Sequence, residues 1–93
     1  MELTKEQRHE AYKLALEKMS EQKYMCNAIS LAITSIYKIS YSFNINNFPE
    51  FKSKKPVNKL PDSVWFYTSE YGEDEAFNIR TEILAQCIEE TKP

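Results

Sequence analysis

The chain has a single glycine, Gly72, among its 93 residues. Tight turns in β-rich folds use backbone conformations with positive φ, which glycine adopts most readily. The low glycine content therefore argues against a β-rich fold. It favours a fold of helices that are joined by ordinary loops. At this length we expect one domain, spanning residues 1–93, with one compact core.

Apolar residues recur at helical spacing in three stretches, which predict helices over residues 5–20, 24–38 and 73–90. Thr4 and Gln7 form a capping box at the start of the first helix. Its outer face is charged and polar. The segment 20–23 is expected to break the helix, but it has no glycine or proline, so the helix could also continue. If the break is real, the first two helices form an antiparallel hairpin.

The second stretch has the broadest apolar face and carries no charged residue between residues 25 and 37. A helix this apolar is expected to be the central one, packed on more than one side. Residues 39–43 alternate polar and apolar, which fits either the end of this helix or a short strand. A strand there could pair with residues 64–68. Asparagines and prolines predict an irregular loop over residues 44–63. The expected fold is therefore a three-helix domain with a long aromatic-rich loop and, in one version, two short strands.

The segment from residue 41 to 71 combines aromatic and basic side chains. It holds eight of the twelve aromatic residues together with Lys52, Lys54, Lys55 and Lys59. Aromatic rings stack on bases and lysines neutralise phosphates, so the combination suits a nucleotide-like ligand. The alternative is that the aromatic residues fill the core while the lysines are solvated. Under the first interpretation the ligand-binding residues of this segment are Phe51, Lys54, Lys55, Trp65 and Tyr67.

Arg80 is a charged residue on the apolar stripe of the third helix, between Phe77 and Ile83. Such a charge must be paired, reach outward or face a ligand. One interpretation is a structural clamp, in which Glu50 pairs with Arg80 and holds the long loop. The other is an anion-binding arginine, because a guanidinium suits phosphates and carboxylates. Both interpretations remain open at the level of sequence.

The residue types that support catalysis or metal binding are sparse. The single histidine, His9, is expected on the outer face of the first helix, away from Cys26 and Cys87. A nucleophilic cysteine needs a nearby base, and two distant cysteines with one histidine do not have the spacing of a zinc site. We therefore expect no enzyme activity, no metal and no cofactor.

The formal net charge is −2 and no apolar run approaches the ~20 residues that span a bilayer. The first residues lack the basic start and apolar centre of a signal peptide. These features predict a cytoplasmic protein without a membrane partner, in which both cysteines are reduced thiols.

A set of short motifs runs from Tyr24 onward: Tyr24-Met25-Cys26, Phe48-Pro49-Glu50-Phe51, Lys55-Pro56, Trp65-Phe66, Gly72, Arg80 and Leu84. This order resembles a pattern in small uncharacterised proteins of bacteriophages, prophages and gut bacteria. The resemblance implies a phage-type accessory protein working in the host cytoplasm, and such proteins resemble inhibitors of bacterial defence. Some of those sequester nucleotide-derived signals and others dock on a defence protein. The resemblance transfers no catalytic residue.

The leading hypothesis is therefore a non-enzymatic inhibitor of bacterial immunity that sequesters a small anionic, nucleotide-derived signal. The first alternative is a protein–protein inhibitor that docks on a host defence protein or nuclease, which the acidic balance favours. Two further alternatives are a small hydrolase or transferase that uses Glu50 or another carboxylate of the loop, and a structural subunit that self-associates through the first or second helix. A homodimer also fits the sequence, because three short helices can leave apolar surface uncovered.

Overall fold

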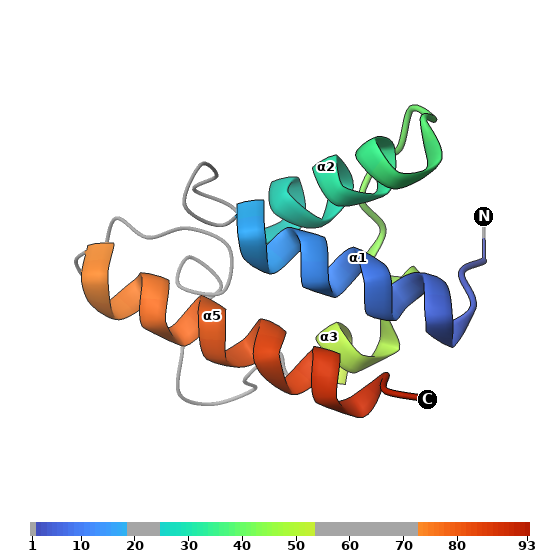
Figure 1. Cartoon of the computed structure of the whole chain (residues 1–93). Coiled ribbons are helices and arrows are strands. Elements are labelled where there is room, and N and C mark those ends of the chain that lie inside the picture. Colours follow the sequence, from blue (N-terminus) through green and yellow to red (C-terminus); the bar gives the residue numbers. More distant parts are fainter. Residues whose placement is uncertain (1, 19–24, 54–72) are drawn as a thin grey trace.

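A computed structural model describes residues 2–18, 25–53 and 73–93, and every structural statement below concerns these residues. The elements are helices and no strand occurs among the described residues, so the mainly helical fold predicted from the sequence is confirmed (Figure 1). The elements are α1 (Lys5–Lys18), α2 (Met25–Tyr37), the 3-10 helix η1 (Ile45–Asn47), α3 (Pro49–Ser53) and α5 (Glu73–Glu90). None of these helices is both long enough and apolar enough to cross a membrane.

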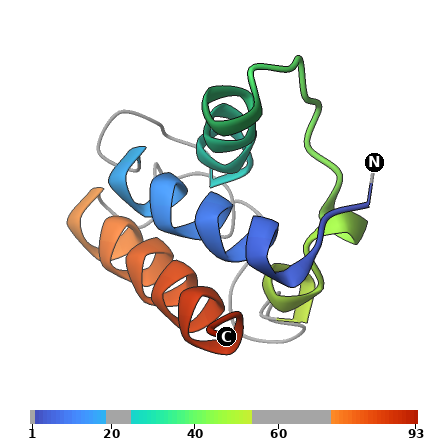
Figure 2. The same ribbon diagram turned by 45° about the vertical axis from the view of Figure 1, so that its right-hand side comes forward.

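Helix α1 lies between α2 and α5 and packs against both (Figures 1 and 2). It runs opposite in direction to each of them (Figure 1). The prediction that the second helix is central was therefore wrong. On its inner faces α1 presents Ala11 and Ala15, and α2 meets it with Ala28 and Ala32, all fully buried. Burial of these small side chains, and not a broad apolar face, accompanies the central position of α1.

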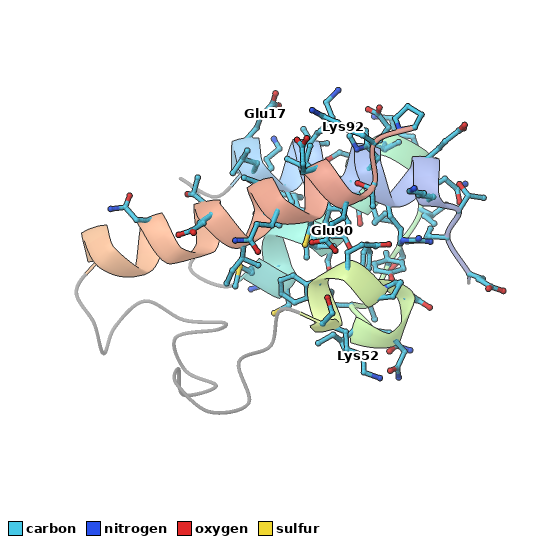
Figure 3. The ribbon with its side chains drawn as sticks, turned by 90° about the horizontal axis from the view of Figure 1, so that it is seen from below. Glu17, Lys52, Glu90 and Lys92 are labelled. Atoms are coloured by element: carbon cyan, nitrogen blue, oxygen red, sulfur yellow. The ribbon has the colours of Figure 1, made fainter. Side chains whose placement is uncertain are left out.

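The start of α1 is fixed by the capping box that the sequence predicts. The backbone N–H of Thr4 donates to Gln7 Oε1 at 2.8 Å, and the N–H of Gln7 donates to Thr4 Oγ1 at 3.1 Å. Each bond satisfies a backbone donor that has no partner inside the helix. The exposed sides of the elements carry charged side chains, such as Glu17 on α1 and Lys52 on α3 (Figure 3).

Helix α2 ends where Lys38 adopts a left-handed backbone conformation, with φ of 56°. This turns the chain away from the helix axis, as left-handed residues do at many helix ends. Residues 39–44 then have no regular structure. At the end of this stretch, Asn44 Oδ1 accepts a hydrogen bond from the N–H of Asn46 and caps η1. The proposed strand over residues 39–43 is therefore not formed, and residues 64–68 lie outside the described residues.

Helix α3 occupies part of the segment that was expected to be an irregular loop. Pro49 stands at its first position, where the fixed φ of proline suits a helix and the missing N–H is not needed. A helix of five residues does not persist on its own in water. The side chains of Phe48 and Phe51 anchor it, because both are completely buried in the core.

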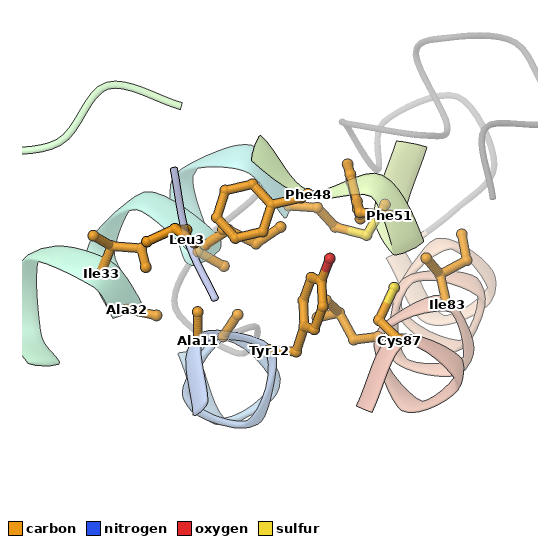
Figure 4. Packing of buried hydrophobic residues seen from close by; sticks show 14 residues of the cluster. Leu3, Ala11, Tyr12, Ala32, Ile33, Phe48, Phe51, Ile83 and Cys87 are labelled. Carbon is orange, nitrogen blue, oxygen red and sulfur yellow. The ribbon is translucent and has the colours of Figure 1, made fainter. Parts of the chain in front are cut away.

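The core is one cluster of buried apolar side chains from all the described α-helices and from the residues beside them (Figure 4). Phe48 is at its aromatic centre. Its ring stacks on Phe43 with centroids 5.7 Å apart, and it also contacts Tyr12 at 5.7 Å and Tyr41 at 6.3 Å. The aromatic residues of this part of the chain therefore serve packing, as one of the two interpretations of the segment proposed. The buried cluster consists of Leu3, Ala11, Tyr12, Ala15, Met25, Ala28, Ile29, Ala32, Ile33, Phe48, Phe51, Ile83, Leu84 and Cys87.

Replacing Phe48 by alanine should lower the free energy of unfolding by about 3–5 kcal/mol, because the substitution leaves a cavity at the aromatic centre. Urea unfolding followed by circular dichroism measures this loss. Ile39→Ala is the control, since Ile39 is 37% exposed and its truncation should change stability by about 0.5 kcal/mol or less. Equal losses in the two variants would contradict the central role of Phe48.

Candidate functional site

Of the predicted ligand-binding residues, only Phe51 has a side chain that the structure describes. Phe51 is fully buried and its ring meets Phe43 edge-on at 5.8 Å, which leaves no exposed face for a ligand to stack on. Lys54, Lys55, Trp65 and Tyr67 lie outside the described residues. Arg80 belongs to α5, but its side chain is not among those described. Phe51 is therefore a packing residue and not a ligand-stacking one, because burial removes its ring from the surface. A ligand site formed by the other predicted residues stays a prediction.

Glu50 on α3 makes a polar contact with α1 that joins residues 42 positions apart in the sequence. Arg8 Nε donates to Glu50 Oε1 at 2.8 Å and the terminal nitrogen Nη2 donates to Oε2 at 2.9 Å, so the guanidinium grips both carboxylate oxygens. The hydroxyl of Tyr12 donates to Oε1 at 3.0 Å. The other terminal nitrogen of Arg8, Nη1, donates to the carbonyl of Leu3 at 2.8 Å. We call the group Arg8, Tyr12 and Glu50 the clamp.

The clamp is largely shielded from water, since the Arg8 and Glu50 side chains are only 16% and 14% exposed. Burial acts to raise the pKa of Glu50, but the hydrogen bonds from Arg8, the backbone and Tyr12 outweigh it and lower the pKa below its usual value. The hydrogen bond to Glu50 raises the pKa of Arg8. Burial, with the neighbouring Cys87 and Glu50, raises the pKa of Tyr12 far above its usual value. The clamp therefore consists of a carboxylate, a guanidinium and a neutral phenol.

The structure gives Glu50 a partner that sequence reasoning missed. The sequence suggested Arg80 on the third predicted helix, whereas Arg8 on α1 binds Glu50 in the structure. Tyr12 was likewise not among the site residues predicted from the sequence. A sequence signal exists, because Arg8 precedes Tyr12 by four residues and so shares a helix face with it. Whether Arg80 also approaches Glu50 stays a prediction, because the Arg80 side chain lies outside the described residues.

His9 links α1 to the end of α5. Its Nδ1 lies 3.1 Å from the carbonyl oxygen of Ile88 and 3.0 Å from Thr91 Oγ1. Thr91 is 1% exposed and uses its own hydroxyl proton to donate to the carbonyl of Cys87 at 2.7 Å. Because both atoms facing Nδ1 are therefore acceptors, the hydrogen-bond network assigns the proton to Nδ1. His9 is half-buried against α5, so the prediction that it faces outward was wrong.

A hollow of about 280 Å³ lies beside this histidine, between the first half of α1 and the end of α5. Carboxylates stand on its α1 side, and the carbonyl end of α5 carries the negative pole of the helix dipole. Lys13 lies 4.0 Å from Glu10, and both side chains are more than half exposed. Water screens this pair, so Lys13 offsets the negative charge of Glu10 only weakly. The hollow therefore suits a positively charged group. Its lining residues are Glu6, His9, Glu10, Thr91 and Pro93.

The cysteines lie in different surroundings. Cys87 is fully buried in the core, and Cys26 on α2 is half-buried; the two do not form a disulfide bond. Burial raises the pKa of the Cys26 thiol, which disfavours the nucleophilic thiolate. Within the described ranges, no group of three histidine, cysteine, aspartate or glutamate side chains is arranged to hold a metal ion.

No protein-family model, no curated protein and no solved structure matches this chain.

Replacing Glu50 by glutamine should lower the free energy of unfolding by about 1–3 kcal/mol, because Arg8 loses a charged partner while the side-chain shape is kept. Chemical denaturation measures the change. Glu17→Gln on the exposed side of α1 is the matched control and should have little effect. If the clamp is one unit, Arg8→Met combined with Glu50→Gln costs less than the sum of the two single losses. An additive double variant would show that the two residues act separately.

The clamp should also make stability depend on acid pH. The lowered pKa of Glu50 means that the folded protein binds this proton less readily than the unfolded chain. Its contribution is therefore complete above about pH 4.3, the usual glutamate value, and is lost as the pH falls through the lower pKa of the folded state. Urea unfolding of the wild type and Glu50→Gln from pH 7 to pH 3 should show a stability difference that shrinks with acid. A difference that stays constant would contradict this assignment.

Proposed function

We propose that this protein is a non-enzymatic, phage-type accessory protein that inhibits bacterial immunity by binding and sequestering a small anionic, nucleotide-derived signal. The observation that carries the proposal is the orientation of α3. Its Glu50 and Phe51 face inward, toward the clamp and the core, while Lys52 faces outward at the end of the helix (Figure 3). Lys54 and Lys55 follow directly in the sequence, so a basic run begins on a firmly anchored helix.

Lys52 keeps its positive charge available. Its Nζ donates to the neutral side chain of Asn46 at 2.8 Å. Within the described part of the chain, no carboxylate forms an ion pair with it. A lysine held by an amide is oriented but not neutralised, which suits an approaching phosphate.

The aromatic residues divide between packing and the proposed binding role. Tyr12, Phe48 and Phe51 are fully buried, and Phe43 is partly buried against the core. We assign ligand stacking to the aromatic residues that follow the basic run in the sequence, led by Trp65 and Tyr67. Stacking of a base on such a ring contributes about 1–3 kcal/mol per base.

A thermal-shift screen of the purified protein against cyclic dinucleotides, ADP-ribose derivatives and common nucleotides tests the proposal. A ligand that binds the folded state raises the melting temperature in a saturable way. The shift should disappear in Trp65→Ala and weaken in Lys54→Glu/Lys55→Glu. Lys5→Glu/Lys13→Glu makes the same change of charge at exposed positions of α1 and should keep the shift. A flat screen with folded protein, or a shift that survives in Trp65→Ala, would reject the proposal.

A second candidate function is a protein–protein inhibitor that docks on a host defence protein or nuclease. The hollow beside His9 favours it, because a lysine or arginine side chain of a partner would meet Glu6, Glu10 and the carbonyl end of α5 there. The charge of α5 points the same way, since its sequence holds six carboxylates against the single Arg80. A helix sequence with this excess of acidic residues would complement a basic partner, such as a protein that binds nucleic acid.

Docking through the hollow would make Glu10 a contact residue. In a pull-down from a bacterial lysate, Glu10→Lys should remove a protein that the wild type captures. Glu17→Lys is the matched control, because Glu17 is also exposed on α1 but does not line the hollow. Capture should also weaken as salt is raised, since charge pairs at a rim are screened. Equal capture by the two variants would exclude the hollow as the docking site.

A further inference from the structure

We draw no further inference here: the strongest candidate outside the sites already described, the uncharged outer face of α2 formed by Asn27, Leu31 and Thr34 near the exposed Ile39, carries nothing because nothing in the structure shows what covers it.

Discussion

The arrangement of α3 against α1 depends on the hydrogen bonds of the Glu50 carboxylate. This carboxylate receives two hydrogen bonds from Arg8 and one from Tyr12, and these residues reach it from a helix far away in the sequence. A buried ion pair contributes less to stability than its geometry suggests, because both charges lose water. Its stronger effect is on specificity. A carboxylate with three fixed donors tolerates only one orientation of α3, which sends Phe51 inward and Lys52 outward.

The apolar core and the clamp support each other. Phe48 and Phe51 bury the short α3 against the rest of the domain, and this burial removes water from around Glu50. In a drier environment the hydrogen bonds of the clamp are stronger, but a missing partner also costs more. Tyr12 belongs to both systems, because its ring packs against Phe48 while its hydroxyl binds Glu50. A change at any of these positions therefore affects packing and charge together.

Local sequence rules predicted the local features well. The helical stripes gave α5 with its observed bounds, and the capping box of Thr4 and Gln7 forms as expected. What could not be predicted depends on contacts between distant segments. The α3 helix was not predicted, because the asparagines and prolines around it disfavour regular structure. The burial of Phe48 and Phe51, which the local sequence does not reveal, stabilises this helix. His9 was predicted to face outward, and the contact of Arg8 was not predicted, because a polar residue on a helix gives no local sign of a distant acceptor.

The contact surfaces between neighbouring helices, which we call seams, differ in the side chains that form them. Among the described residues, side-chain hydrogen bonds link α1 to α3 and α1 to the end of α5, whereas none links α1 to α2. The buried side chains of α2 are alanine, isoleucine and methionine, and the sequence of this helix holds no charged residue. Acid pH and low temperature should therefore weaken different seams first. Acid acts on the α1–α3 seam through Glu50, whereas cooling weakens the apolar α1–α2 seam, because the hydrophobic effect fades at low temperature.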